Sequence, residues 1–411
     1  MKKTVLIALV IACIFPTFAA QAFETREELR SAYQSIAPVE GELFETEPSI
    51  NDPYAAGTLS DSARQNALDT VNFLRAVAHL NAVEESALYD LRCGHAAVLL
   101  AKNDYVDHDP PQPEDMPDEF YVSAHEGTSQ GNLAGMNWMR PTILAEGLRY
   151  FVRDDGEANL SLLGHRRWIL NPQMGETGFG VANSESGKSY VVMYALDDSA
   201  DCEWSEVCWP SAGAFPAELM HADLAWSISL NPEKYDIEGS DPVITLCEAH
   251  SGLSFTFDLR NETGDGYCRI STEGFGSGAC LIFRPDFSDT DFTDYCQNQC
   301  WTVRVVGLCG EHDTLSYEVR MESLYVQDVS NVEMSENAAE MAVGEEIQLS
   351  ANVIPEYADD LTLSWSSSDA SIASVDADGT VTALAEGICE ITAKSANGRA
   401  DYCQITVSSG N

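Results

Sequence analysis

Two histidines in the first half of the chain, His108 and His165, stand beside turn-forming residues and could share one site. His108 lies in the run Asp-His-Asp-Pro-Pro at 107–111, and His165 lies in Gly-His-Arg-Arg-Trp-Ile-Leu-Asn-Pro at 164–172. A neutral imidazole can bind a metal ion, and near pH 7 it can also accept and release a proton. If the fold brings these two rings together, they form a candidate site for either chemistry.

A structural role for the same residues is the competing interpretation. Arg166 and Arg167 follow His165 and precede Trp168, so this loop could lock the domain through hydrogen bonds and a cation–π contact. His108 stands between Asp107 and Asp109, which could hold it in an ion pair.

The elements that must position these histidines are helices followed by a strand. A helix is predicted from Asp61, with an apolar face formed at spacings of three and four residues by Ala67, Val71, Leu74 and Ala78. A second helix is predicted from about Glu84 to Asn103, with Leu88, Leu91, His95 and Val98 on one stripe. A third runs from about Pro141 to Val152, and the apolar run at 189–196 is predicted to be a strand. Helices before strands favour an α+β layered fold, in which His95 is a satisfied core histidine.

Residues 64–197 resemble the bacterial form of the CAP superfamily, the cysteine-rich secretory, antigen and pathogenesis-related proteins. The resemblance depends on Asn-Phe-Leu-Arg at 72–75, the helix ending at 103–108, Asn-Leu-Ala at 132–134, the 164–172 motif and Gly-Phe-Gly-Val-Ala at 178–182. It implies an α-β-α sandwich with a cleft that holds two histidines and two acidic residues. By the same resemblance His108 and His165 take the histidine positions, and Asn132 lies in the cleft.

The acidic half of the expected cleft departs from the family pattern. Gln130-Gly131 stand where the family often has Gly-Glu before Asn132, which leaves Glu126 as the nearest substitute. The second acidic position has no clean match, and Glu146, Asp154 and Asp155 compete for it. His108 and His165 could still bind Zn²⁺ weakly, but a catalytic zinc normally has three protein ligands. This weakens the prediction of an enzyme.

The favoured function is therefore non-catalytic binding of an extracellular ligand, which could be a small apolar molecule, a metal ion or a protein. Family members have been linked to sterol and lipid binding, which the resemblance permits for this chain. One alternative is a metal-assisted hydrolase in which His108 and His165 hold zinc and Glu126 or Glu146 is the general base. The other is a purely structural surface-display protein.

Charge and the N-terminus indicate an exported protein. The chain has 66 acidic and 22 basic residues, a net charge of −44, and such a surface repels nucleic acid. Lys2-Lys3, an apolar run to Phe18 and a small-residue site before Phe23 predict a signal peptide over residues 1–22. Lipoprotein processing at Cys13 is the alternative. No second apolar span follows, so the predicted mature chain has no transmembrane helix and is secreted, with attachment to the cell surface left open. Residues 23–58 are read as an acidic arm.

Of the 12 cysteines, Cys13 lies in the leader and Cys93 stands alone as a predicted buried free thiol. The others are expected to form disulfides in an exported chain. A zinc site at Cys296-x-x-x-Cys300 is the weaker alternative, because no second tight pair completes it. Eight of the paired cysteines fall between residues 202 and 309.

Those eight cysteines lie in a predicted all-β, sandwich-like module over residues 201–327. Apolar residues alternate there, as in Leu253, Phe255, Phe257 and Leu259, and turns rich in Gly and Asp separate the runs. The acidic turn at 286–294 could hold calcium, but the absence of ordered ligand spacing favours a solvated loop.

Residues 328–411 resemble a bacterial Ig-like domain of group 2. The resemblance depends on Gly-Glu-Glu-Ile-Gln-Leu at 344–349, Leu-Ser-Trp-Ser-Ser-Ser-Asp at 363–369, the run at 372–381 and Ala-Glu-Gly at 385–387. It implies a β-sandwich that spaces or displays other domains. A hairpin loop centred on Ala396 would place Cys389 opposite Cys403, which predicts a disulfide between them.

Overall fold

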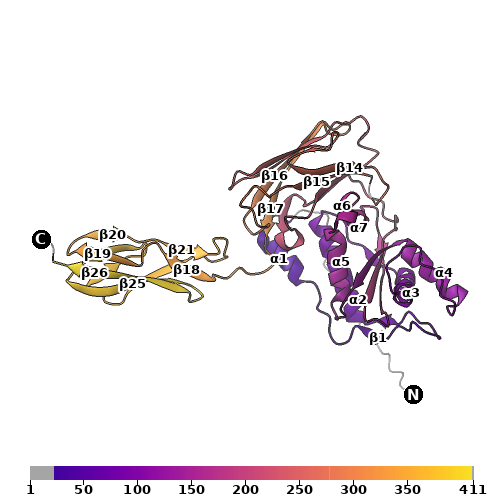
Figure 1. Ribbon diagram of the computed structural model, residues 1–411, viewed down its shortest axis with the longest axis horizontal. Coiled ribbons are helices and arrows are strands. Elements are labelled where there is room, and N and C mark those ends of the chain that lie inside the picture. Colours follow the sequence, from indigo (N-terminus) through magenta and orange to yellow (C-terminus); the bar gives the residue numbers. More distant parts are fainter. Residues whose placement is uncertain (1–22, 277, 410–411) are drawn as a thin grey trace, which may run out of the picture. The chain divides into compact units, whose positions relative to one another are not determined.

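The computed structural model describes residues 23–276 and 278–409 (Figure 1). They belong to two compact units, the first ending at Glu322 and the second beginning at Ser323. The predicted leader, including Cys13 and the cut after Ala22, lies outside the described residues. Among the helices that are described, none is both long enough and apolar enough to cross a bilayer. The predicted boundary near residue 200 falls inside the first unit and stays a prediction.

The first half of the first unit contains a three-stranded antiparallel sheet in the order β4-β7-β6. Its strands are β4 (Gly131–Met136), β7 (Ser189–Tyr194) and β6 (Phe179–Asn183). Side chains alternate across β7: Tyr190 and Val192 join the core beneath α3 (Ala87–Asn103), whereas Val191 lies against Gly147 of α5 (Ile143–Arg153). Helices therefore cover both faces of this sheet. The α+β layering agrees with the sequence prediction, and the assignment to the CAP superfamily stays a prediction.

Further elements complete this part of the unit. Helix α2 (Asp61–Val77) packs on α5, and α4 (Asp118–Ser129) packs on α3. The predicted face of α2 is confirmed, because Ala67, Val71 and Leu74 are fully buried. The remaining short elements are β1 (Phe44–Thr46), β2 (Thr58–Leu59), β3 (Glu84–Glu85), α6 (Glu157–Leu160), α7 (Gly164–Ile169) and β5 (Glu176–Thr177).

The stripe predicted for α3 is wrong in its first half. Leu88 and Leu91 are 54% and 48% exposed, and small residues such as Cys93 and Ala97 form the buried face instead. The reason is a close approach between helix and strand: a Cβ at Gly180 of β6 would overlap the backbone carbonyl of Cys93. Short side chains on α3 allow that approach, and larger ones are turned outward.

The predicted N-terminal arm contains a helix, α1 (Arg26–Gln34). Thr25 and Glu28 form a capping box at its start, and Leu29 is fully buried. Arg26 forms an ion pair of 2.6 Å with Glu322, and the Tyr33 ring lies 5.5 Å from that of Phe73 in α2. The prediction of an acidic arm or linker over residues 23–58 did not include this helix, which packs against both halves of the first unit.

The second half of the first unit is a two-sheet β-sandwich, as predicted. The four-stranded sheet has the order β14-β15-β10-β8, and the six-stranded sheet has the order β13-β12-β11-β16-β17-β9. The strands are β8 (Glu206–Trp209), β9 (Gly213–Pro216), β10 (Trp226–Leu230), β11 (Val243–Glu248), β12 (Ser254–Asp258), β13 (Thr263–Gly264), β14 (Gly266–Ser271), β15 (Ala279–Pro285), β16 (Cys300–Val306) and β17 (Thr314–Glu322), with the 3₁₀ helix η1 (Ala217–Leu219) after β9. Trp226 of one sheet and Trp301 of the other are fully buried with ring centroids 6.2 Å apart, so aromatic rings fill the space between the sheets.

The second unit consists of β-strands. Its sheets have the orders β19-β26-β25-β22, β20-β24-β23 and β18-β21. The strands are β18 (Asn331–Met334), β19 (Ala338–Ala342), β20 (Glu346–Gln348), β21 (Ala351–Ile354), β22 (Leu363–Ser367), β23 (Ala373–Val375), β24 (Thr380–Ala383), β25 (Gly387–Ser395) and β26 (Ala400–Ser408). Val381, Ile391 and Ile405 are fully buried at its core.

The expected disulfides are not formed among the described residues other than Cys296, where the remaining ten cysteines are free thiols. In the second unit the hairpin register pairs Cys389 with Ile405 and Ile391 with Cys403. The two thiols are therefore diagonal neighbours rather than directly opposed, at a separation that typically exceeds what a disulfide spans. In the sandwich, Cys208 pairs with Ile228 and Cys268 with Phe283, so neither has a cysteine across the strand. The prediction for Cys93, a buried free thiol, is confirmed.

Candidate functional site

His108 lies in the loop after α3, and two hydrogen bonds connect it to Thr128 near the end of α4. Its Nδ1 donates a hydrogen bond to the carbonyl oxygen of Thr128 at 2.8 Å. In return, the Thr128 hydroxyl donates to the backbone carbonyl of His108 at 3.3 Å. A carbonyl oxygen only accepts hydrogen bonds, so the proton of a neutral His108 ring resides on Nδ1 and the lone pair on Nε2.

His165 is held in the same way by a buried carboxylate. It is the second residue of α7, and its Nδ1 lies 2.8 Å from Oδ1 of Asp154, whose side chain is fully buried. The second oxygen of Asp154 accepts the backbone N–H of Arg166 at 3.2 Å, and the His165 ring stacks on Phe151 at 5.5 Å. Asp154 caps α5 in the left-handed conformation with a φ of 50°, which directs its side chain toward α7. This partner orients the imidazole and leaves Nε2 with its lone pair.

Asn132 connects the two histidines through one short segment. Its side-chain amide donates to the carbonyl oxygen of His165 at 2.9 Å, while Thr128, four residues earlier, holds His108. Four residues span at most roughly 14 Å. The segment 128–132, at the junction of α4 and β4, thus contacts the His108 ring and the backbone of His165. A cleft shared by the two imidazoles stays a prediction.

The two glutamates predicted for the cleft are engaged elsewhere. Glu126 of α4 forms an ion pair of 2.8 Å with Arg92 of α3. Glu146 accepts hydrogen bonds from the Trp138 indole at 2.7 Å and the Thr142 hydroxyl at 2.8 Å, in the first turn of α5. Asp154 is eight residues further along that helix, a rise of about 12 Å. Of the acidic residues that competed for the second position, Asp154 is the one that contacts a histidine.

The arginines after His165 have the structural role that the sequence allowed. Arg166 is 1% exposed and donates to the carbonyl oxygens of Val152 at 2.6 Å and Ala225 at 2.7 Å. Burial lowers its pKa to about 10, although Asp154 opposes this shift. Arg167 reaches the Ser271 hydroxyl at 2.9 Å and lies over the Phe275 ring at 5.6 Å, so the expected cation–π contact exists but not with Trp168. The motif thereby ties the α/β part to the sandwich.

The donor set at this junction does not form a zinc centre of the catalytic type. In the chain outside residues 1–22, 277 and 410–411, no group of three or more His, Cys, Asp and Glu side chains is arranged to hold a metal ion. Two Nε2 atoms supply fewer ligands than the three of a catalytic zinc. The acidic turn at 286–294 is likewise engaged internally: Asp294 accepts the Ala222 N–H at 3.0 Å and faces His221 at 3.0 Å.

Thr128 and Phe151 were missed as functional positions by the sequence reasoning. Thr128 acts mainly through its backbone carbonyl, which any residue possesses, so no side-chain signal could have identified it. Phe151 lies two residues before the C-terminus of α5 and looks like an ordinary core residue in the sequence.

Comparison with known proteins identifies the C-terminal part. Residues 328–405 match the bacterial Ig-like domain (group 2), which confirms the sequence prediction for this domain. A 79-residue segment is 38% identical to lacto-N-biosidase of Bifidobacterium bifidum, covering 19% of this chain and 7% of that protein. An 82-residue segment is 39% identical to an Ig-like virion protein of Serratia phage KSP90, covering 20% of this chain and 32% of that protein. The chain thus spans less than a third of each of these relatives.

Among solved structures, the chain is similar to domains 4 and 5 of the S-layer protein SbsC, with a TM-score of 0.20 at 18% identity over 26% of this chain and 65% of that one. It is also similar to a mutant of EHEC O157:H7 intimin, with a TM-score of 0.17 at 23% identity over 19% of this chain and 47% of that one.

Proposed function

We propose that this chain is an exported bacterial binding protein in which a CAP-type α/β part presents two histidines and the Ig-like domain spaces or displays that part outside the cell. The Ig-like match over residues 328–405 supports the display role. The net charge of −44 supports an extracellular protein that does not bind nucleic acid. The layered sheet and the motif at 164–172 support the CAP-type assignment.

One observation carries the proposed site: both imidazoles are fixed through Nδ1, and the segment 128–132 contacts His108 through the Thr128 carbonyl and the backbone of His165 through Asn132. The acceptors are the Thr128 carbonyl and the Asp154 carboxylate, both at 2.8 Å. Such partners fix the tautomer and raise the basicity of the remaining nitrogen. Both Nε2 atoms are left as ligand atoms, as in proteins that use histidine to bind a transition metal.

Binding is favoured over hydrolysis because the carboxylates predicted as general bases, Glu126 and Glu146, have other partners among the described residues. A general base must lie within hydrogen-bond reach of the proton that it removes. Glu126 and Glu146 are engaged with Arg92 and Trp138, respectively, and Asp154 is buried behind His165. The proposed ligand of the cleft is a metal ion such as Zn²⁺ bound with waters, or a small apolar or protein ligand that the same cleft accepts.

Calorimetric titration with zinc chloride at pH 7.4 and 150 mM salt tests this proposal. The full-length protein should bind about one zinc per chain, and the double variant His108→Ala/His165→Ala should lose that binding. His312→Ala is the matched control, because His312 is exposed on the sandwich. Identical isotherms for the wild type and the double variant would remove the metal site.

A second assay separates binding from catalysis. The protein and the double variant are incubated with a peptide mixture and with nitrophenyl esters, and product is compared with buffer alone. The binding proposal expects no turnover from either protein. Turnover by the wild type that the double variant lacks would replace the proposal with the hydrolase alternative.

A further inference from the structure

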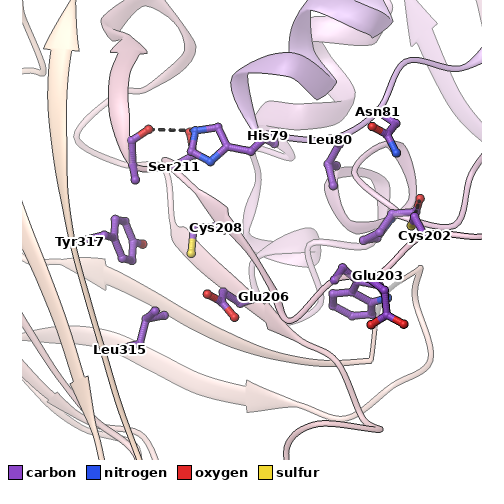
Figure 2. Close-up of a pocket in the computed structure, with 14 residues that line it drawn as sticks. His79, Leu80, Asn81, Cys202, Glu203, Glu206, Cys208, Ser211, Leu315 and Tyr317 are labelled. Atoms are coloured by element: carbon purple, nitrogen blue, oxygen red, sulfur yellow. Dashed lines mark hydrogen bonds between the residues drawn. The ribbon is translucent and has the colours of Figure 1, made fainter. Parts of the chain in front are cut away.

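A second site lies elsewhere in the first unit, in a pocket of about 260 Å³ (Figure 2). It is formed by the residues that follow α2, by strand β8 with its flanking segments, and by strand β17. Figure 2 shows His79 above Cys208 and Glu206 below it, with Tyr317 on one side and Cys202 on the other. Its volume lies just below the roughly 300–1,000 Å³ of drug-sized ligand sites, so it suits a small molecule.

A buried hydroxyl in the pocket wall lacks a partner. The Oη of Tyr317 is buried and makes no hydrogen bond with any described residue. Burial chiefly, and then the neighbouring Cys208 and Glu206, raise the pKa of Tyr317 well above its ordinary value. The Cys208 thiol is a poor hydrogen-bond partner and cannot satisfy a phenol fully. This oxygen has less than 1 Å² of accessible surface and faces the Cys208 thiol, so a ligand in the pocket contacts the rest of the Tyr317 side chain and not its hydroxyl.

The carboxylate of Glu206 is also left without a positive partner. It accepts only a long hydrogen bond of 3.4 Å from the Tyr235 hydroxyl, and none of the ion pairs among the described residues includes it. Lys234, the neighbouring base, pairs instead with Glu203 at 3.7 Å and with Glu311 at 3.6 Å. A half-buried carboxylate without a cation favours a positively charged ligand.

The rest of the lining adds no positive charge. His79 Nε2 donates to the carbonyl oxygen of Ala212 at 3.0 Å, and burial lowers the pKa of His79, so the ring is neutral at pH 7. Apolar surface comes from the side chains of Leu80, Pro172, Trp204 and Leu315. The pocket therefore combines acceptors for hydrogen bonds with walls suited to an apolar body.

We propose that this pocket binds a small organic cation, a protonated amine carried on an apolar body. The ammonium group pairs with the Glu206 carboxylate, while the body packs against Leu80, Trp204 and Leu315. A carboxylate ligand is rejected, because Glu206 lines the pocket and has no ion-pair partner among the described residues. This site uses neither His108 nor His165 and does not depend on the function proposed for them.

Calorimetric titration of the full-length protein with 2-phenylethylamine at pH 7.0 tests the proposal. The neutral analogue 2-phenylethanol and the anionic analogue 3-phenylpropionate have similar bodies and serve as probes of charge. We expect saturable binding of the amine, binding at least tenfold weaker for the alcohol, and none for the acid. The variant His108→Ala/His165→Ala should bind the amine as the wild type does.

Two conservative variants locate the site. Glu206→Gln keeps the shape and removes the charge, and should weaken amine binding at least tenfold. Tyr317→Phe should leave amine binding within about twofold of the wild type, because the buried hydroxyl is not accessible to the ligand. Glu318→Gln is the matched control, because Glu318 is exposed on the same strand and its side chain alternates to the other face from Tyr317. Thermal unfolding of each variant checks that it is folded.

Three outcomes would overturn the proposal. The first is the absence of heat from 2-phenylethylamine at millimolar concentration with the folded wild type. The second is equal affinity for the amine and for 3-phenylpropionate. The third is an equal effect of Glu206→Gln and Glu318→Gln, which would assign the binding to the overall negative charge of the surface.

Discussion

Replacing Asp154 with asparagine should destabilise the first unit and loosen His165. The Asp154 carboxylate is fully buried and accepts two hydrogen bonds, from His165 Nδ1 at 2.8 Å and from the Arg166 N–H at 3.2 Å. An asparagine keeps one acceptor oxygen and turns an NH₂ group toward the other donor. Hydrogen bonds to charged groups each contribute about 1.5–3 kcal/mol, so the loss of one predicts a decrease of about 2 kcal/mol in the free energy of unfolding.

Replacing Asp154 with asparagine changes its hydrogen bonds without adding backbone strain. Asp154 has a φ of 50°, a conformation that asparagine tolerates and alanine does not, so Asp154→Ala would add strain to the lost hydrogen bonds. Asp155→Asn is the matched control. Asp155 is the next residue, it is more exposed than Asp154, and the described residues make no hydrogen bond to its carboxylate. We expect its free energy of unfolding to change by less than about 0.5 kcal/mol.

Urea unfolding at pH 7 and 25 °C, followed by tryptophan fluorescence, measures this difference. Six of the seven tryptophans lie before residue 323, so the signal reports mainly on the first unit. If the two Nε2 atoms bind zinc, Asp154→Asn should also weaken zinc binding by about 10- to 100-fold. Equal unfolding midpoints for Asp154→Asn and Asp155→Asn would refute the reasoning, because they would show that the carboxylate does not hold α7.

Three further changes test the electrostatics and packing of the first unit. Burial would raise the pKa of Glu248, but hydrogen bonds from Ser251, Cys300 and His250 lower it to about 2. The stabilisation from the ionised Glu248 carboxylate is present above about pH 4.5 and is lost as the pH falls from 4.5 to 2. Glu248→Gln should therefore be roughly 2 kcal/mol less stable than the wild type at pH 6 and nearly as stable as the wild type at pH 2. Urea unfolding at several pH values measures this difference. Burial chiefly, with Glu85, raises the pKa of Asp90 to about 7, although the Phe179 N–H opposes this shift. Folding is then penalised as pH rises from about 4 to 7, and thermal unfolding should show Asp90→Asn to be more stable than the wild type at pH 8 but not at pH 4. Gly180→Ala should cost at least about 3 kcal/mol in urea unfolding, because its Cβ would overlap the backbone of Cys93, whereas Gly187→Ala at an open turn should cost less.

Local hydrophobic patterns predicted the elements whose buried residues can be recognised within the element itself. The buried face of α2 follows its helical spacing, and the apolar run predicted as a strand at 189–196 forms β7 over Ser189–Tyr194, with every residue buried. Helix α3 failed this test because its partner strand carries Gly180, and a close helix–strand approach selects Cys93 and Ala97 over Leu88 and Leu91. That choice depends on a residue nearly ninety positions away, which periodicity within the helix cannot reveal.

The N-terminal helix α1 could have been predicted. Thr25 followed three residues later by Glu28 is the signature of a capping box, and Leu29 and Ala32 supply a short apolar face. Acidic residues and prolines in the rest of residues 23–58 masked this signal. The charge was read as solvation, although Glu28 in the first turn serves to cap the helix.

The hairpin of the Ig-like domain illustrates how sensitive a cross-strand pair is to the turn. The sequence prediction centred the loop on Ala396, whereas the pairing of Lys394 with Ala400 centres it on Asn397. Moving the centre by one residue moves each partner by two, so both cysteines stay on the buried face and lose their direct opposition. The side-chain face was predictable from alternation. The register was not, because the turn residues alone determine it.

At the candidate site, the sequence motifs predict which residues stabilise the fold, but they do not predict which carboxylates contact the histidines. In the 164–172 motif, Arg166 and Arg167 are buried and donate to the backbone of α5 and of the sandwich, and Arg75 of the 72–75 motif donates to the carbonyl oxygens of Ile169 and Asn171. Most of the residues that produced the family resemblance therefore hold the domain together, and another protein could share them without sharing a ligand. What bears on function is the chemistry that remains: two Nε2 atoms, Glu126 and Glu146 held by other partners, and a separate pocket in which Glu206 has no ion pair among the described residues. Because that chemistry depends on where Asp154, Glu126 and Glu146 find their partners, a matching motif supports a fold, and only the pairing of the carboxylates decides between binding and catalysis.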